Sequence, residues 1–197
     1  FDAAPNTLTV DVTAVNDAPV STNDTVTTNE DTTVVLSVSD FGTYSDVESN
    51  PLTAVQITTL ESDGSLEYDT TGAGAWAAVT LNQIISAADI TAGRLRFVPD
   101  ANENGSPYAT IGFKVGDGTD FSTAAYTLTV NVTPVNDAPV VTADASTAYT
   151  QSAPAVVVDS SVPVTDVDDT NIESATVTIS NVDRTNDLLT LNAAATA

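Results

Sequence analysis

Apolar and polar residues alternate along several segments of the chain, and clusters of Asp, Asn, Gly and Pro separate those segments. In residues 109–115, for example, Ile111, Phe113 and Val115 fall on one face of an extended chain, and residues 126–132 have an apolar face of the same kind. A strand of this pattern buries one side and exposes the other to solvent. The segments rich in Thr, Val, Ile, Tyr and Phe are 32–40, 52–60, 93–99, 109–115 and 124–135. They predict an all-β fold made of antiparallel Greek-key β-sandwiches, each with two packed sheets.

One segment, residues 81–90, has the spacing of a helix instead. Its apolar residues with that spacing are Leu81, Ile84, Ile85 and Ala88. Residues three or four positions apart share one face of a helix. We expect at most a short helical turn here, preceding the strand predicted for residues 93–99.

A long phrase of the sequence occurs twice. TLTVDVTAVNDAPV at residues 7–20 recurs as TLTVNVTPVNDAPV at residues 127–140, an offset of 120 residues (127 − 7 = 120). The same offset places SDVES at residues 45–49 over TDVDD at residues 165–169. Two distant matches at one offset indicate tandem repeats. We therefore divide the chain into residues 1–17, the C-terminal strand of a preceding repeat; residues 18–137, one complete β-sandwich repeat; and residues 138–197, the N-terminal part of a following repeat.

The composition narrows the chemistry that this chain can perform. Its 197 residues include 27 Asp and Glu against 4 Lys and Arg, a formal net charge of −23, so the phosphates of nucleic acids would repel it. No apolar run approaches the roughly 18 residues that a membrane-spanning helix needs, and we expect no insertion into a membrane. Cysteine and histidine are both absent, which removes thiolate and imidazole metal sites and the commonest catalytic groups. We expect no enzymatic activity, and carboxylates remain as the plentiful chemical groups.

Acidic residues from three distant segments are expected to meet at one end of the complete repeat. In a sandwich, the loop between the second and third strands lies at the same end as the loop between the last two strands. Four carboxylates and one amide oxygen would meet there beside the incoming linker, and Ca²⁺ takes about 6 to 8 such oxygens. These candidate ligands, which we call the entry set, are Asn16, Asp17, Asp46, Glu48 and Asp117.

The opposite end of the repeat offers a second group, which we call the exit set. Glu30 follows the first strand, and two more acidic residues follow the strand predicted for residues 93–99. The outgoing linker and the next repeat supply the remaining members. The full exit set is Glu30, Asp100, Glu103, Asn136, Asp137, Asp166 and Asp168. It predicts a second Ca²⁺ site at the following junction.

A simpler interpretation applies to each of these residues by itself. Asp and Asn are common in turns because their side chains bond to nearby backbone, and an acidic surface keeps a protein in solution. The recurrence of the same residue types at equivalent places favours the metal site over this interpretation.

Several joined phrases carry a family resemblance. They are VNDAPV, which occurs twice, DFGTYSDVESNPLTAVQI, IISAADITAGRLRFVPDANENG and FKVGDGTDFSTAAYTLTVNVTPVNDAPV. These phrases resemble the cadherin-like, immunoglobulin-fold tandem repeats of giant bacterial surface adhesins, which are type I secreted proteins of the repeats-in-toxin class. By this resemblance, the Asn-Asp pairs of both linkers match the linker ligands of the family, and Asp46, Glu48 and Asp117 match its acidic loops. Glu48 stands where the family often has aspartate.

The resemblance implies an extracellular, structural role at a bacterial cell surface. The repeats would act as extenders, with Ca²⁺ at the junctions stiffening a fibre that supports adhesion and biofilm formation. The chain would be a monomer whose partners are neighbouring repeats, while other domains of the parent protein bind any surface ligand.

Two other functions stay open at this point. One is a ligand-binding adhesion module, in which a repeat face or the segment around Trp76 recognises a glycan or a host protein. The other is an accessory repeat of a secreted polysaccharide-degrading enzyme.

Overall fold

The computed structural model describes residues 7–143, 147–148, 150, 153–159 and 162–177. By its internal contacts the chain divides into two compact units, Phe1–Val135 and Asn136–Ala197. The first unit contains the sandwich and is described first. Parts of the exit set lie in each unit.

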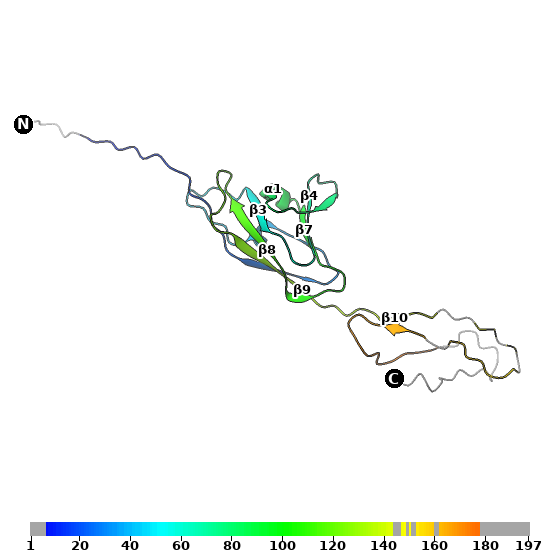
Figure 1. Cartoon of the computed structure of the whole chain (residues 1–197). Helices are drawn as coiled ribbons and strands as arrows, with labels where there is room; N and C mark the ends of the chain where they lie inside the picture. Colours follow the sequence, from blue (N-terminus) through cyan, green and yellow to red (C-terminus); the bar gives the residue numbers. More distant parts are fainter. Residues whose placement is uncertain (1–6, 144–146, 149, 151–152, 160–161, 178–197) are drawn as a thin grey trace, which may run out of the picture. The chain divides into compact units, whose positions relative to one another are not determined.

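The first unit is built from two sheets packed face to face (Figure 1). The larger sheet has the strand order β1-β9-β8-β3-β6, with β1 at Asp24–Asn29, β9 at Tyr126–Thr133, β8 at Gly105–Gly116, β3 at Ala54–Thr59 and β6 at Ile84–Ser86. The smaller sheet has the order β2-β7-β4-β5, with β2 at Val34–Val35, β7 at Leu95–Val98, β4 at Ser65–Asp69 and β5 at Trp76–Ala78. This confirms a mostly β protein with one Ig-like β-sandwich.

The sheets are antiparallel at every pairing of these strands except one. β1 runs parallel to β9, with Asp24 opposite Leu128 and Asn29 opposite Thr133. The prediction of purely antiparallel sheets was therefore wrong at this edge. β1 and β9 lie far apart in sequence, so no hairpin turn forces them to run in opposite directions.

The core lies between the sheets and follows the predicted alternation. Ile111, Phe113 and Val115 of β8 are all buried, and so are alternate residues of β9. The rings of Phe41 and Phe113 meet edge to face, with centroids 5.1 Å apart. Each large apolar side chain buried in this way contributes about 1.5–3 kcal/mol to folding. The apolar face of β8 and β9 therefore supplies much of the driving force for closing the sandwich.

The segment predicted to have a helical face forms two elements. Residues Ile84–Ser86 belong to β6, and the helix α1 covers only Ala87–Thr91. Ser86 caps this helix by accepting a hydrogen bond from the Asp89 backbone N–H at 3.0 Å. Leu81 and Ile84 are exposed whereas Ile85 is buried, so the single apolar face was a wrong prediction. The short helical turn itself is confirmed.

The strand predicted for residues 32–40 is also shorter than expected. Within residues 32–40, only Val34–Val35 are assigned to a strand, β2, and the chain then turns into the 3₁₀ helix η1 at Val38–Phe41. Phe41 is buried at the end of this helix and joins the core. The turn thus brings a large aromatic side chain inward from the sequence that follows β2.

The described residues of the second unit include one short pairing. β10 at Val140–Val141 is antiparallel to β11 at Val164–Thr165. Both strands are exposed. Across the described part of the chain, no helix is long and apolar enough to cross a membrane.

Candidate functional site

The incoming linker touches two loops of the sandwich that it precedes. Asn16 Nδ2 donates to Asp117 Oδ2 at 3.0 Å and to Asp120 Oδ2 at 3.1 Å. Its other amide atom, Oδ1, accepts from Asn50 Nδ2 at 3.3 Å. One linker side chain therefore joins the loop after β8 to the loop before β3.

A second linker residue reaches the same loop before β3. The backbone N–H of Asp17 donates to Glu48 Oε2 at 3.1 Å. Two residues further on, Pro19 is buried, and Val20 pairs with Ser45 through hydrogen bonds of 2.8 and 2.9 Å. The loop that carries Asp46 and Glu48 is thereby held alongside the linker.

Asp46 contributes the least satisfied acidic group of this end. Its Oδ1 accepts from the Asn50 backbone N–H at 2.8 Å. Its Oδ2 is buried and has no hydrogen-bond partner among the described residues. A buried carboxylate oxygen without a donor is costly, because the water that it has lost is not replaced. Asp46 Oδ2 is therefore an unsatisfied acceptor at this end of the sandwich.

The loop after β8 is shaped by its own aspartate. Asp117 Oδ1 accepts from the backbone N–H groups of Thr119 at 2.6 Å and Asp120 at 2.8 Å. These two backbone hydrogen bonds, followed by the one from Asn16, hold the pKa of Asp117 below its ordinary value of 3.8. Burial works in the opposite direction but is outweighed. Asp117 is therefore ionised at neutral pH, with its Oδ2 directed to the linker.

The same local field acts on a neighbouring tyrosine. Burial raises the pKa of Tyr44, and the negative charges of Asp46 and Asp117 raise it further. The hydroxyl of Tyr44 donates to the Asn50 carbonyl at 3.0 Å. The phenol thus stays protonated, and its hydrogen bond to Asn50 stabilises the loop before β3.

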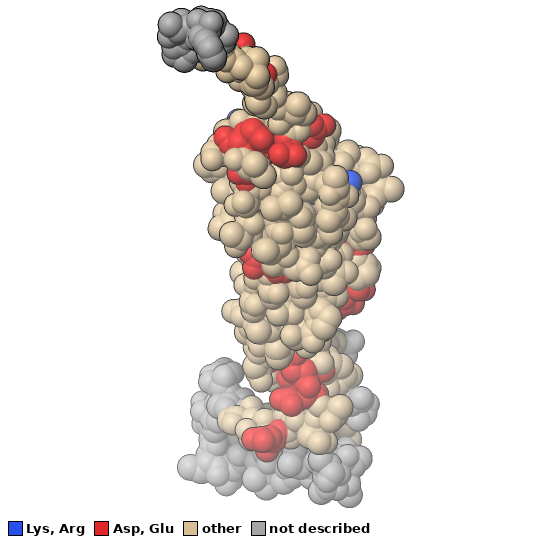
Figure 2. All heavy atoms as spheres, turned by 90° about the vertical axis from the view of Figure 1, so that its left-hand side faces the viewer, with Lys and Arg blue, Asp and Glu red and all other residues tan. Residues whose placement is uncertain are grey.

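All five members of the entry set lie at one end of the sandwich, as the loop argument predicts. Two residues outside that set, Asn50 and Asp120, belong to the same cluster. Figure 2 shows acidic side chains gathered where the N-terminal segment leaves the sandwich. The sequence signal for Asp120 was present in GDGTD, because an aspartate three positions after Asp117 falls in the same tight turn. We call these seven residues the entry cluster: Asn16, Asp17, Asp46, Glu48, Asn50, Asp117 and Asp120.

The carboxylates of the entry cluster are linked through amides rather than gathered around one point. Over the part of the chain that the structure describes, no group of three or more acidic side chains is arranged to hold a metal ion. Asn16 presents its nitrogen, not its oxygen, to Asp117 and Asp120. The Ca²⁺ site remains a prediction, and the cluster supplies its candidate ligands.

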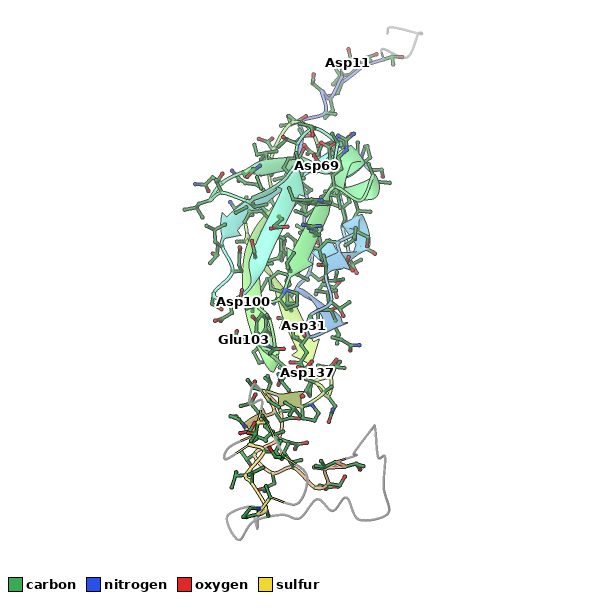
Figure 3. All side chains as sticks on the ribbon, turned by 90° about the vertical axis from the view of Figure 1, so that its right-hand side faces the viewer. Asp11, Asp31, Asp69, Asp100, Glu103 and Asp137 are labelled. Carbon is green, nitrogen blue, oxygen red and sulfur yellow. The ribbon has the colours of Figure 1, made fainter. Side chains whose placement is uncertain are left out.

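The three exit-set residues of the first unit have separate contacts. Asp100 Oδ2 accepts from the Gly64 backbone N–H at 3.2 Å, and Glu103 Oε2 accepts from the Tyr108 hydroxyl at 3.0 Å. Figure 3 shows Asp100 and Glu103 toward the end of the sandwich that lies away from Asp69. Glu30 is only 2% exposed. Its carboxylate accepts from the Val135 backbone N–H and from Asn104 Nδ2.

The exit-set residues of the second unit repeat contacts seen in the entry cluster. The Asp137 N–H donates to the Asp168 carboxylate, just as Asp17 donates to Glu48. The pairing of Val140 with Thr165 likewise repeats that of Val20 with Ser45. Each pair of contacts is related by the offset of 120 residues. The joint Ca²⁺ site that combines both parts of the exit set stays a prediction.

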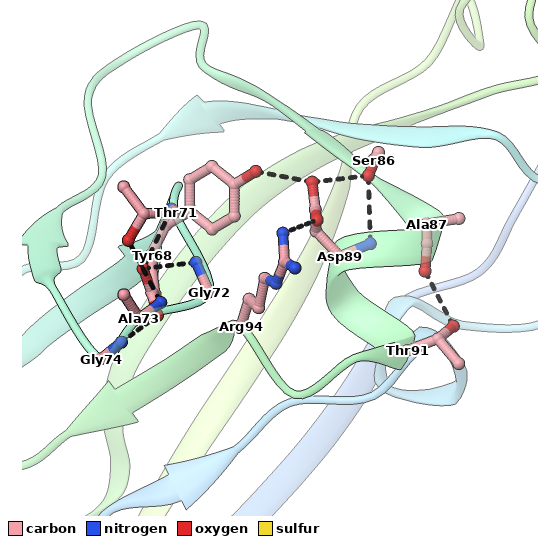
Figure 4. Close-up of polar contacts among 11 residues, drawn as sticks. Tyr68, Thr71, Gly72, Ala73, Gly74, Ser86, Ala87, Asp89, Thr91 and Arg94 are labelled. Atoms are coloured by element: carbon pink, nitrogen blue, oxygen red, sulfur yellow. Dashed lines mark hydrogen bonds and ion pairs between the residues drawn. The ribbon is translucent and has the colours of Figure 1, made fainter.

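Two further acidic residues form networks that the sequence did not indicate (Figure 4). Asp69 is buried and accepts from the backbone N–H groups of Thr71, Gly72 and Gly74 and from the Thr71 hydroxyl. These hydrogen bonds outweigh the effect of burial and lower the pKa of Asp69 to about 2. With its acceptor sites filled by its own loop, Asp69 stabilises the turn between β4 and β5.

Asp89 forms the second network. It accepts from the hydroxyls of Tyr68 and Ser86 and pairs with Arg94 at 2.6 Å. The hydrogen bonds from Tyr68 and Ser86 lower the pKa of Asp89. The network ties α1 to β4 through Tyr68 and to Arg94 just before β7, and all of these donors bond to this one carboxylate.

The surroundings of Trp76 bear on the alternative of a sugar site. The guanidinium of Arg96 lies 4.0 Å from the centre of the Trp76 ring, and Arg96 also pairs with Glu67 at 2.7 Å. A cation in this position occupies one face of the aromatic ring. That face is therefore covered by the protein itself.

Residues 16–133 match the sequence model of a family described as the bacterial Ig domain. The match spans both sheets of the sandwich and contains every residue of the entry cluster. A search of curated proteins found no match to the chain.

Proposed function

Because the chain belongs to the bacterial Ig domain family, whose members are typical of surface proteins, we propose that it is a structural extender of a bacterial cell-surface adhesin. Ca²⁺ at the inter-domain junctions stiffens the fibre in this proposal. The chain catalyses no reaction, lies outside the cell as a monomer, and has neighbouring repeats as its partners. The observation that carries the proposal is the attachment of Asn16 and Asp17 to acidic loops of the sandwich that follows them.

The first argument concerns the joint itself. An extender transmits orientation only if the linker between domains has little freedom to bend. Here Asn16, Asp17 and Val20 each bond to a loop of the sandwich, and Pro19 restricts the backbone between them. The linker is therefore fixed to the sandwich that follows it before any ion binds. An ion would then need to restrict only the bending between the linker and the preceding domain.

The second argument concerns the chemistry of the entry cluster. Its donors are carboxylate and amide oxygens, which Ca²⁺ prefers. The buried Oδ2 of Asp46 has no hydrogen-bond partner within the described residues, and Asp117 is ionised at neutral pH. An Asn side chain exchanges its nitrogen for its oxygen by a half-turn of the amide, so Asn16 can serve as a donor or as a ligand. A bound ion would supply positive charge between acidic loops that otherwise repel one another.

The third argument supports the tandem arrangement. Two contacts of the first unit, Asp17 with Glu48 and Val20 with Ser45, recur in the second unit between residues 120 positions later. A repeated sequence that also repeats its contacts is what a chain of similar domains produces. The glycan-binding alternative at Trp76 has no comparable support, since Arg96 covers a face of the Trp76 ring.

The proposal is tested by Ca²⁺ titration of the purified chain, followed by thermal unfolding and small-angle scattering. Sites of the extracellular class bind with dissociation constants near 10⁻⁴–10⁻³ M, so about 10 mM Ca²⁺ is expected to stabilise the folded state by about 1.4–2.7 kcal/mol. The midpoint of unfolding would rise and the scattering profile would report a longer, stiffer particle.

Matched variants locate the effect. Asp46→Asn and Asp117→Asn remove charge from the entry cluster and are expected to reduce the response to Ca²⁺. Asp63→Asn removes the same charge from an exposed turn outside the cluster and is expected to leave the response unchanged. No response of the wild-type chain at 10 mM, or an equal response in all three variants, would contradict the proposal.

A further inference from the structure

The N-terminal segment Thr7–Val15 has the pattern of a β-strand but takes part in no strand pairing among the described residues. Leu8, Val10 and Val12 lie on one face of it and are 88%, 72% and 89% exposed. Figure 1 shows this segment extending away from the sandwich of the first unit. An apolar strand face left in water is unfavourable, which raises the question of what covers it.

The sequence of the segment identifies the kind of surface that it fits. Residues 7–13 and 127–133 differ only at Asp11 and Asn131. Residues 127–133 lie in β9, which pairs with both β8 and β1 and is the second strand from one edge of the larger sheet. There Leu128, Val130 and Val132 are buried in the core. Their counterparts at the offset of 120 are the exposed Leu8, Val10 and Val12.

The polar contacts of β9 can also be reproduced by the segment. The Thr127 N–H donates to Asn23, Ser106 donates to the Asn131 side chain, and Thr133 donates to the Thr28 carbonyl. Just after β9, the Val135 N–H donates to the buried Glu30. The counterparts Thr7, Thr13 and Val15 are identical residues, and Asp11 retains a side-chain oxygen for the serine. The segment therefore carries both the apolar and the polar determinants of β9.

We propose that Thr7–Val15 is the closing strand of a separate sandwich of this same family, and that it can fill the β9 position of a second copy of this chain. In that second copy, the segment would lie between β8 and β1, where β9 normally lies. The carboxylate of Glu30 would accept a hydrogen bond from the residue that follows the segment's strand, as it does from Val135. The inference rests on the repeat organisation proposed above but not on Ca²⁺.

In the first unit, the position between β8 and β1 is normally occupied by the chain's own β9, because β9 is covalently connected to β8. A tethered strand competes at a high effective concentration against a strand from another molecule. Exchange between copies is therefore expected only when β9 is displaced, as happens during unfolding and refolding at high protein concentration. A folded monomer at low concentration keeps its own β9.

The test uses the full chain, unfolded in guanidinium and refolded with EDTA at low and high protein concentration. Size-exclusion chromatography with light scattering is expected to show dimers and larger species that increase with concentration. Val10→Asp is expected to reduce their yield several-fold, because an aspartate would face the core of the second copy. Val47→Asp is the matched control, since Val47 is another exposed valine outside the segment. Monomer alone at every concentration, or equal loss in both variants, would overturn the proposal.

Cysteine trapping shows where the segment docks, since the natural sequence contains no cysteine. Thr129 of β9 lies opposite Thr110 of β8, so its counterpart Thr9 would meet Thr110 of a second copy. Co-refolding Thr9→Cys with Thr110→Cys under oxidising conditions is expected to give a disulfide-linked heterodimer. Thr9→Cys with Thr71→Cys, in the turn between β4 and β5, is the control pair. Equal yields from the two pairs would overturn the proposed docking position.

These outcomes are independent of the Ca²⁺ titration. A chain that responds to Ca²⁺ but shows no strand exchange would retain the stiffened-junction function and lose this inference. A chain that exchanges strands but shows no response to Ca²⁺ would retain this inference and contradict the stiffened-junction function.

Discussion

The same phrase of sequence occurs in two very different surroundings in this protein. In residues 127–133 it is a central strand whose apolar side chains are buried between two sheets, and in residues 7–13 it is an unpaired segment whose apolar side chains face solvent. The local sequence therefore determines the alternation of apolar and polar positions, while the partner strands determine whether the apolar face is buried. Strand propensity of this kind reflects packing against neighbours more than an intrinsic backbone preference.

The largest expected effect on stability comes from introducing an aspartate at equivalent positions of the two copies, one copy at a time. Val130→Asp puts a carboxylate where the native side chain is 0% exposed, and it is expected to lower the free energy of unfolding by at least about 3 kcal/mol. Val10→Asp makes the equivalent change in the exposed copy and is expected to alter it by less than about 0.5 kcal/mol. Urea denaturation followed by tryptophan fluorescence measures both. Equal destabilisation would show that the two copies share one environment after all.

The second prediction concerns the valine that lies two positions after each copy of the repeated segment. Val135 donates its N–H to the buried Glu30, whereas the equivalent Val15 is exposed and precedes the sandwich. Glu30→Ala removes the acceptor and is expected to lower the free energy of unfolding by about 1–3 kcal/mol. The Val135 amide would also exchange faster with solvent deuterium, as an unpaired amide does.

Two companion variants sharpen the test of Glu30. Glu30→Gln keeps a side-chain oxygen and is expected to recover part of the stability. Glu103→Ala removes a carboxylate from the exposed surface, where its contact is with the Tyr108 hydroxyl, and is expected to have a small effect. If Glu103→Ala destabilises the chain as much as Glu30→Ala, the buried hydrogen bond between Glu30 and Val135 is not what makes Glu30 important for stability.

Much of the sandwich was predictable because its longest strands alternate strictly. β8 and β9 were identified with their buried faces, since core packing selects that pattern. β4 and β5 were missed, and β1 was expected before Glu30 but given no bounds, because these strands are short or polar and their extended form depends on neighbouring strands. The parallel pairing of β1 with β9 also left no local signal, because it joins segments about 100 residues apart in sequence.

The candidate site was predictable in part for a different reason. Loop topology alone places Asn16 near Asp117 and Asp17 near Glu48, without knowledge of any side-chain position. The burial of Glu30 was not predictable, because it depends on how the end of β1 packs against residues that follow β9. Glu30 was placed with the candidate metal ligands by its position, and that role stays a prediction; in the structure its carboxylate accepts from the Val135 backbone N–H and from Asn104.

Acid provides the smallest and most local test of how the first linker is attached. The pKa of Asp117 is lowered in the folded protein, so its ionised form stabilises the folded loop above the ordinary value of 3.8, and this stabilisation is lost as the pH falls through the lowered value. Protonation would weaken the hydrogen bond from Asn16. Between pH 6 and pH 2.5, the NMR signals of the Asn16 side-chain amide are expected to move toward those of a free amide only at the acid end of the range. Asn16 also donates to Asp120 Oδ2, so the control is the double variant Asp117→Asn with Asp120→Asn, in which the same signals are expected to lose most of this pH dependence. If they still move in that variant as they do in the wild type, the carboxylates of Asp117 and Asp120 are not the groups that attach the incoming linker.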